Sequence, residues 1–191
     1  TVFDRLGVEH EVIPHDDLAR RYPQFNHDGF EFGHYVPSTG VLMAKKGCLA
    51  VVQAFERQGG RFILAKATLG QRSGGALQEV TLSTGATVSA QTFVFACGPW
   101  LPQVLPHPMR DRLVTPRRVT FWYGVPPDDD RFTYPNCPNW SVRGVYGFPS
   151  IEGRGFKVAT SFDSVPFDPD TGERVVTAEE IRRARQFVRE S

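Results

Sequence analysis

The segment from Tyr146 to Lys157 constrains the fold of this chain more than any other. It reads Tyr-Gly-Phe-Pro-Ser-Ile-Glu-Gly-Arg-Gly-Phe-Lys, so two apolar runs flank a turn that contains Gly153 and Gly155. Apolar runs separated by a glycine-containing turn are typical of a β-hairpin. Because a hairpin is a rigid element, we expect the phenol of Tyr146 and the ammonium of Lys157 to be held in fixed positions, as a catalytic or substrate-orienting group requires.

The spacing of apolar residues before residue 106 predicts a mixture of helices and strands. We expect helices at 15–22 and 44–58 and strands at 11–14, 61–69, 77–82 and 92–96. Asp16 or Asp17 is a candidate cap for the first of these helices, because a carboxylate accepts from free backbone N–H groups at a helix start. Gly59 and Gly60 follow the second helix, as glycines often do at a C-terminus.

The sequence after residue 106 changes in character. Prolines and aromatic residues dominate, and apolar positions alternate in 113–125 and 146–161, which predicts a largely antiparallel sheet. At the C-terminus, Thr177 and Glu180 have the spacing of a capping box at the start of an amphipathic helix. The predicted fold therefore combines an α/β part with an α+β part.

Composition and charge argue against several classes of function. The chain has 191 residues with 22 basic and 21 acidic side chains, a balance that gives no long-range attraction to nucleic acid. The basic and aromatic residues of 117–123 therefore fit a strand with one apolar face better than a single-strand binding site. No run approaches the roughly 18 apolar residues of a membrane span, and we expect no secretory signal.

The cysteines and histidines indicate neither a disulfide framework nor a metal site. Cys48, Cys97 and Cys137 are scattered and include no CxxC pair, which favours reduced thiols in a cytoplasmic protein. His27 and His34 have no cysteine or carboxylate at ligand spacing beside them, so we expect loop or surface histidines and no metal.

Three segments together resemble a known enzyme family. They are Pro37-Ser-Thr-Gly-Val-Leu-Met43, Phe93-Val-Phe-Ala-Cys-Gly-Pro-Trp100 and the hairpin segment Tyr146–Lys157. In this order and spacing they resemble the sarcosine oxidase-like, FAD-dependent amine and amino-acid oxidases of the D-amino-acid oxidase superfamily. The resemblance runs from near residue 9 to near residue 172.

The resemblance implies a division into functional segments. Residues 1–36 would lead into a substrate domain, 37–105 would form part of an FAD-binding Rossmann-like domain, and 106–191 would form an antiparallel substrate domain. The implied activity is oxidation of an amine or N-methyl amino acid to an imine, with FAD passing the electrons to dioxygen and giving hydrogen peroxide.

The resemblance also implies roles for individual residues. Tyr146 and Lys157 would be catalytic, with Lys157 beside the flavin where its charge favours the reaction with dioxygen. Tyr146, Phe148 and Ser161 would line the substrate pocket. The residues implied to contact the cofactor are Leu69, Ala96, Cys97, Gly98 and Trp100.

The chain departs from the family pattern in three places. Ser161 stands where the sarcosine-oxidising members carry a histidine, so the cavity would be roomier or differently charged and sarcosine itself is in doubt as the substrate. The sequence contains no GxGxxG segment to hold the FAD pyrophosphate. The family's C-terminal signature is also absent. These two absences lead us to expect that the chain is the middle of a longer protein.

Two alternatives to an oxidase remain open from the sequence. A dehydrogenase on the same fold would pass the electrons to a carrier instead of dioxygen. A non-catalytic module would only pack or dimerise, and would bind neither FAD nor substrate.

Overall fold

The computed structural model describes residues 1–160 and 166–191. These residues form two compact units. The first contains Thr1–Leu42, Arg117–Val165 and Glu173–Ser191, and the second contains Met43–Pro116 and Pro166–Gly172. The predicted mixture of helices and antiparallel sheets is confirmed, whereas the functional labels on 1–36, 37–105 and 106–191 stay a prediction.

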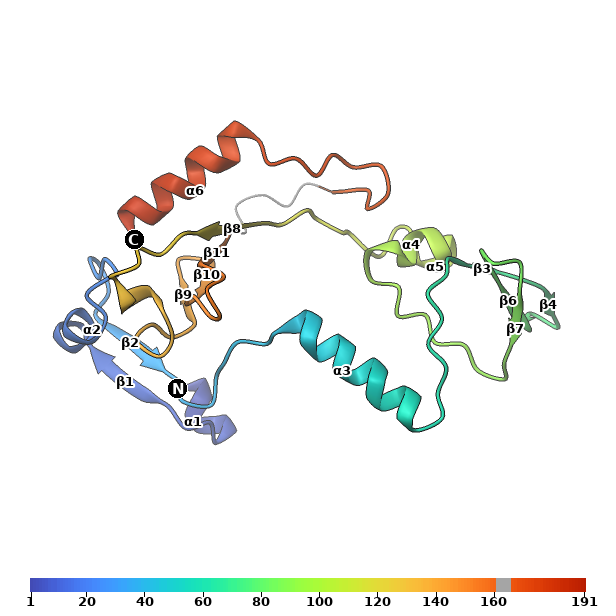
Figure 1. Ribbon diagram of the computed structural model, residues 1–191, viewed down its shortest axis with the longest axis horizontal. Coiled ribbons are helices and arrows are strands. Elements are labelled where there is room, and N and C mark those ends of the chain that lie inside the picture. The colour runs from blue at the N-terminus through green and yellow to red at the C-terminus, as the bar shows by residue number, and fades with distance from the viewer. Residues whose placement is uncertain (161–165) are drawn as a thin grey trace. The chain divides into compact units, whose positions relative to one another are not determined.

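The first unit is built around a four-stranded antiparallel sheet (Figure 1). Its strands, in spatial order, are β8 (Val119–Tyr123), β11 (Phe156–Thr160), β10 (Val145–Phe148) and β9 (Trp140–Val142). The predicted hairpin is therefore confirmed as β10 and β11, with Tyr146 opposite Ala159 and Phe148 opposite Lys157.

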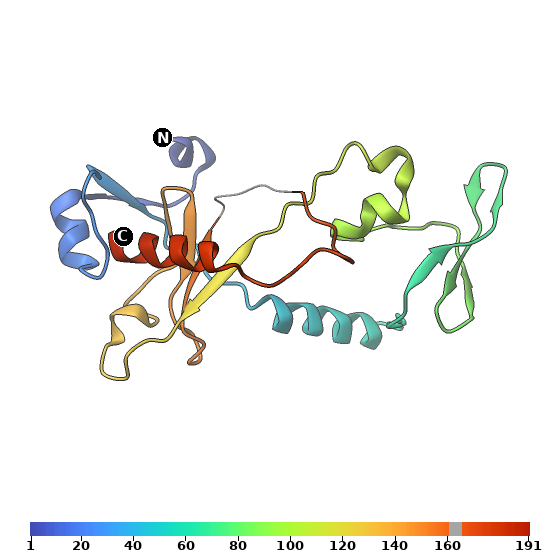
Figure 2. The same cartoon turned by 90° about the horizontal axis from the view of Figure 1, so that it is seen from above.

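One face of this sheet forms the core of the unit. Val145, Phe156 and Val158 are buried there with Cys137. Helix α6 (Ala178–Glu190) lies beside the sheet, as Figure 2 shows, and its Phe187 packs against this core. Burial of these side chains is the main favourable term holding α6 to the sheet.

A second, two-stranded sheet lies in the same unit. It consists of β1 (Glu11–Pro14) and β2 (Phe32–Tyr35), joined by α2 (His15–Arg21) and a loop, and α1 (Val2–Leu6) precedes it. The predicted cap on α2 is wrong, because the N-cap residue is Pro14 and makes no side-chain capping bond. Asp16 and Asp17 lie instead in the first helical turn, where carboxylates favour the positive end of the helix dipole.

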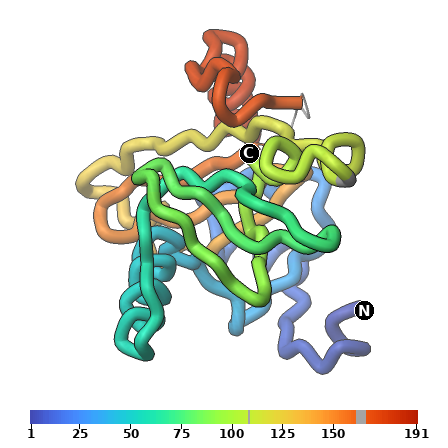
Figure 3. The backbone as a smooth tube through the Cα atoms, turned by 90° about the vertical axis from the view of Figure 1, so that its right-hand side faces the viewer, coloured from blue at the N-terminus to red at the C-terminus, as the bar shows by residue number. Residues whose placement is uncertain are grey.

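The second unit contains one long helix, small antiparallel sheets and short helices. Its helices are α3 (Ala44–Arg57), η1 (Gly98–Trp100), α4 (Leu101–Val104) and α5 (Pro106–Met109). Its strands are β3 (Ala67–Leu69), β4 (Arg72–Ser73), β5 (Ala76–Leu77), β6 (Glu79–Leu82) and β7 (Thr87–Ser89). The hairpin of β6 and β7 can be followed in green in Figure 3. The predicted helix at 44–58 is confirmed, and Gly59 follows it with φ 88°.

Two of the predicted strands are wrong in whole or in part. The segment 92–96 is not a strand, and only Ala67–Leu69 of the predicted strand 61–69 is one. Leu64 and Val94 are 90% and 86% exposed. A strand needs a neighbour to pair with its backbone groups, and the described residues provide none for these two segments.

The start of α6 gives a direct test of the fold. The Thr177 hydroxyl accepts from the Glu180 N–H at 3.2 Å, and the Glu180 carboxylate accepts from the Thr177 N–H at 2.8 Å, which confirms the predicted capping box. We expect Thr177→Ala to lower the free energy of unfolding by about 1 kcal/mol, measured by denaturant titration. Thr177→Ser keeps the hydroxyl and should retain most of the stability, and equal losses in both variants would contradict the capping role.

The same capping box predicts a pH dependence. Hydrogen bonding to the Thr177 backbone N–H, followed by that to its hydroxyl and by the nearby Arg117, lowers the pKa of Glu180 from its usual 4.5. Glu180 therefore adds to the free energy of unfolding at pH values above its own pKa in the unfolded chain. This contribution is lost as the pH falls through the lower pKa that Glu180 has in the folded protein. Denaturant titrations at a series of acidic pH values should show that Glu180→Gln loses less free energy of unfolding on acidification than the unchanged protein does.

Candidate functional site

The β10–β11 hairpin brings Tyr146, Phe148 and Lys157 together on the sheet face opposite the core. The Lys157 Nζ lies 4.2 Å from the Phe148 ring centroid and 4.9 Å from the Tyr146 ring centroid. The two rings are 5.9 Å apart. An ammonium over the face of an aromatic ring is attracted by the negative charge of the π system, so the two rings form a cradle for the Lys157 charge.

The Lys157 ammonium is held without being neutralised. Among the residues that the structure describes, no carboxylate forms an ion pair with it. Its other cross-strand neighbour is Trp122 of β8, which is 52% exposed. An aromatic ring offers no lone pair to the N–H groups, so the ammonium keeps its hydrogen-bond donors for a ligand.

Gly147 allows the strand between Tyr146 and Phe148 to pack closely. A Cβ at this position would collide with the Lys157 carbonyl oxygen and with the ring of Trp140. A glycine inside a strand often marks such a close approach. Trp140 therefore packs directly against the backbone of β10, beneath the two aromatic residues of the cradle.

The turn between β10 and β11 is fixed by its own contacts. Gly153 and Gly155 have φ values of 69° and 88°, and Glu152 also has a positive φ of 55°. The Gly155 N–H donates to the Ser150 hydroxyl at 3.1 Å, and Ser150 is buried. Glycine adopts such positive φ angles without steric cost, so this turn sets which residues of β10 and β11 face each other.

Tyr146 and Phe148 also form one wall of a pocket in the first unit, with a volume of about 560 Å³. The other walls come from β1, α2, β2, β9 and the loops beside them. Its lining residues include Phe30, Tyr35, Asn139, Trp140 and Ser141. Among the described residues that line it, no Asp, Glu, Lys or Arg is present.

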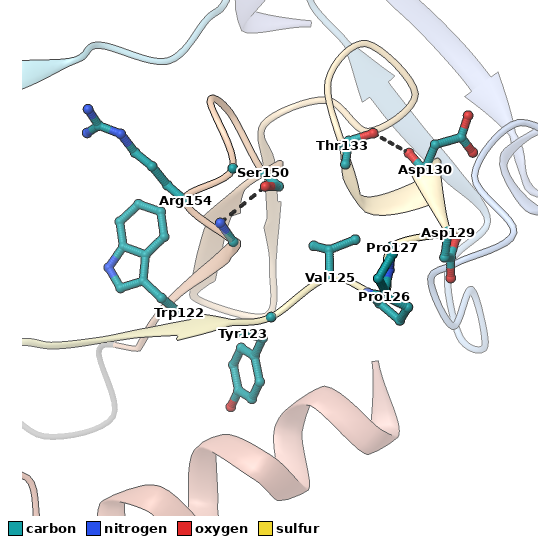
Figure 4. Close-up of a pocket in the computed structure, with 13 residues that line it drawn as sticks. Trp122, Tyr123, Val125, Pro126, Pro127, Asp129, Asp130, Thr133, Ser150 and Arg154 are labelled. Atoms are coloured by element: carbon teal, nitrogen blue, oxygen red, sulfur yellow. Dashed lines mark hydrogen bonds between the residues drawn. The ribbon is translucent and has the colours of Figure 1, made fainter.

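A second pocket lies in the same unit, at the C-terminal end of β8 (Figure 4). It has a volume of about 450 Å³ and is lined by Trp122, Tyr123, Asp129 and Arg154 among others. Its polar groups are largely engaged: the Asp129 carboxylate pairs with Arg131 at 2.7 Å, and Thr133 donates to the Asp130 carbonyl at 2.6 Å. None of the predicted site residues lines this pocket, so we assign it no role in the site.

The residues predicted to contact the cofactor all lie in the second unit. Leu69 ends β3 opposite Val80 of β6, and Ala96 and Cys97 lead into the short helix Gly98–Trp100. Gly98 has φ 52°, and a Cβ there would meet nothing within 4 Å. The indole N–H of Trp100 donates to Asp170 Oδ1 at 2.9 Å. The structure therefore places this set and the Tyr146–Phe148–Lys157 set in different units.

One predicted site residue cannot be placed, and the walls of the pocket were not predicted. Ser161 lies outside the described residues. Phe30, Tyr35 and Ser141 line the pocket but were not among the predicted site residues. The available signal was the aromatic, glycine-spaced stretch at 24–40. Nothing in that stretch indicates that it packs against β9, more than 100 residues further along the chain.

The described residues show two further absences. None of the described helices has the length and apolar character needed to cross a membrane. Within the same part of the chain, no group of three or more His, Cys, Asp or Glu side chains is arranged to hold a metal ion. Cys48, Cys97 and Cys137 are free thiols, and burial raises the pKa of Cys137 to about 11.

Comparison with known families gives a match over nearly the whole chain. The model of the FAD-dependent oxidoreductase family (DAO) matches residues 2–191. A monomeric sarcosine oxidase of Streptomyces avermitilis is 28% identical over 190 residues, covering 92% of this chain and 47% of that protein. A putative sarcosine oxidase of Caenorhabditis elegans is 30% identical over 100 residues, covering 52% of this chain and 26% of that protein.

Solved structures show the same fold at low sequence identity. NikD, an amino acid oxidase essential for nikkomycin biosynthesis, has a TM-score of 0.67 and 18% identity, covering 99% of this chain and 50% of that one. A modified fructosyl peptide oxidase from Aspergillus nidulans has a TM-score of 0.59 and 17% identity, covering 96% and 46%. The chain thus spans about half the length of the relatives that it matches.

The packing at Gly147 gives a test of the site's construction. We expect Gly147→Ala to lower the free energy of unfolding by about 1–3 kcal/mol, because the added methyl group must push Trp140 or the β11 backbone aside. Denaturant titration measures this loss. Gly124→Ala is the matched control, since a Cβ there meets nothing within 4 Å. A Gly147 variant as stable as the Gly124 variant would contradict the packing.

Proposed function

Because the chain belongs to the family of FAD-dependent oxidoreductases, we propose that the intact protein oxidises an amine or N-methyl amino acid to an imine. One observation carries the proposal beyond family membership. The Lys157 ammonium lies over the Tyr146 and Phe148 rings without a carboxylate partner among the described residues, and both rings line a pocket. A positive charge beside a substrate-sized pocket suits a reaction in which negative charge develops.

The chemistry of Lys157 would suit the flavin end of FAD. Lys157 retains donors and charge for a ring that becomes electron-rich on reduction. In the second unit, Leu69, Ala96, Cys97, Gly98 and Trp100 would hold the cofactor, and the open backbone at Gly98 leaves room for a flat group to approach. The sequence has no GxGxxG segment, so none of these residues is assigned to the pyrophosphate.

The chemistry divides between the cofactor and the protein. Bound FAD would accept a hydride equivalent from the carbon beside the amine nitrogen and pass both electrons to dioxygen, leaving an imine and hydrogen peroxide. Tyr146 and Phe148 would form the wall against which the amine is oriented. Lys157 would hold a positive charge, within reach of the reacting groups, that favours the reduction of dioxygen.

A dehydrogenase is the second candidate within the same family. It would share the amine oxidation but pass its electrons to a carrier protein or small molecule. The Lys157 ammonium, which has no carboxylate partner among the described residues, favours the oxidase, because a fixed cation stabilises the charge that dioxygen acquires. The three free cysteines suit reducing surroundings, so we propose that the protein acts in the cytoplasm.

The visible absorption spectrum of the full-length protein tests the proposed function. We expect flavin bands that bleach when N-methyl amino acids are added without oxygen and that return when air is admitted. Bleaching without return in air would favour the dehydrogenase. A colourless protein, even after FAD has been supplied, would contradict both and would support a module without catalysis.

Replacing Lys157 separates the two halves of the reaction. We expect Lys157→Met to slow flavin reoxidation by about 100-fold or more, in line with the loss of a preorganised electrostatic group, while flavin reduction by the amine changes far less. Stopped-flow absorbance measures the two rates separately. Lys157→Arg keeps the positive charge, so its flavin should reoxidise faster than that of Lys157→Met. Equal losses in the two half-reactions would contradict the role of Lys157.

A further inference from the structure

We propose that the pocket beside Tyr146 and Phe148 binds the side group of the substrate and selects an amine or N-methyl amino acid carrying a bulky, uncharged aromatic group. The inference rests on the proposed function, because it concerns the substrate of that same site. It is carried by the size, lining and rigidity of the pocket and by Tyr146 and Phe148, which line the pocket and also contact the Lys157 ammonium.

The size of the pocket exceeds what a small amino acid needs. Its volume of about 560 Å³ lies within the roughly 300–1,000 Å³ range of pockets that hold drug-sized ligands. N-methylglycine, whose side group is a hydrogen atom, would leave most of this volume unfilled. A ring system extending from the reacting amine into the pocket would fill it and bury apolar surface, which is the main source of affinity for such a group.

The lining favours an uncharged group. Phe30, Tyr35 and Trp140 line a space whose described lining residues include no Asp, Glu, Lys or Arg side chain. His27, also in the lining, has its Nε2 2.9 Å from the Tyr22 carbonyl oxygen, so this nitrogen is already engaged. A carboxylate or ammonium side group would lose its hydration without gaining an Asp, Glu, Lys or Arg side chain as an ion-pair partner among the described lining residues, which costs several kcal/mol. An aromatic ring would pack against the aromatic walls.

The walls of the pocket are held in place from outside. The Arg143 guanidinium carbon lies 5.1 Å from the Phe30 ring centroid, and its Nη2 donates to the Asp28 carbonyl at 3.0 Å. The Thr39 hydroxyl donates to Asn139 Oδ1 at 3.3 Å. These contacts tie the loops on both sides of β2 to the residue just before β9 and to the β9–β10 turn. A preformed pocket pays little ordering cost on binding.

The pocket and the charge share two residues. Tyr146 and Phe148 line the pocket and also hold the Lys157 ammonium over their rings. A substrate with its amine near Lys157 therefore has its side group directed past Tyr146 toward Ser141, the cross-strand neighbour of Tyr146 on β9. Ser141 is exposed and lines the pocket, so a larger side chain at this position would narrow the space beside Tyr146.

A substrate series tests the inference on the full-length protein with FAD bound. The probes are N-methyl-L-phenylalanine, N-methyl-L-aspartate and N-methylglycine, and the readout is kcat/KM for hydrogen peroxide formation together with the anaerobic rate of flavin bleaching. We expect the phenyl compound to exceed each of the others by at least about tenfold, the ratio that burying an aromatic side group provides. Equal values, or a preference for the aspartate compound, would overturn the inference.

A matched pair of variants tests whether this pocket is the source of the preference. Ser141→Phe fills the passage beside Tyr146 with a residue that strands accept well, and we expect it to lower the ratio of kcat/KM for the phenyl compound over N-methylglycine by about tenfold. Ser141→Thr, a strand former of nearly unchanged size, should leave that ratio within about twofold. An unchanged ratio in Ser141→Phe would overturn the inference.

Failure of the inference is distinguishable from failure of the proposed function. Flavin that bleaches equally well with all three amines keeps the proposed function and overturns only the aromatic selectivity. Flavin that bleaches with none of them overturns both. If Ser141→Phe does not yield folded protein, the wild-type series decides by itself, because the selectivity it measures needs no variant.

Discussion

The register of β10 on β11 is the constraint on which the first unit depends. With Gly147 opposite Val158 and Phe148 opposite Lys157, the alternation of a strand sends Val158 into the core and Lys157 to the opposite face. A slip by one residue would exchange the two faces, burying the ammonium and exposing the core. The stability of the unit and the geometry of the site therefore follow from the same backbone pairing.

Several independent contacts hold that register in place. The positive φ angles of Gly153 and Gly155 and the bond from the Gly155 N–H to Ser150 fix the turn. Trp140 packs on Gly147 from below and stacks on Phe156 at 5.6 Å between ring centroids. The indole N–H of Trp140 has no hydrogen-bond partner among the described residues, which costs about 1–3 kcal/mol. The close packing of this ring offsets that cost.

The sequence predicts those parts of the structure that short-range chemistry decides. The hairpin, the helix Ala44–Arg57 and the capping box at Thr177 depend on residues a few positions apart, and all three are confirmed. The pocket wall at Phe30 and Tyr35 depends on contacts with β9, and no local pattern encodes those. The prediction that Asp16 or Asp17 caps α2 is wrong because the helix starts directly after a strand that ends in Pro14, so the two carboxylates lie inside the first turn.

The wrong strand prediction at 92–96 has a physical cause, and it concerns the segment that leads into the residues proposed to contact the cofactor. Phe93-Val-Phe-Ala is a strand sequence, yet Val94 is 86% exposed, and α3 buries none of its residues although Leu49 and Phe55 recur on one face. Apolar strands and helix faces of this kind are stable only when covered. Ala96–Trp100 follows the uncovered segment directly. The proposed substrate residues thus lie on a paired sheet within the first unit, whereas the residues proposed to contact the cofactor follow a segment that has no strand partner among the described residues.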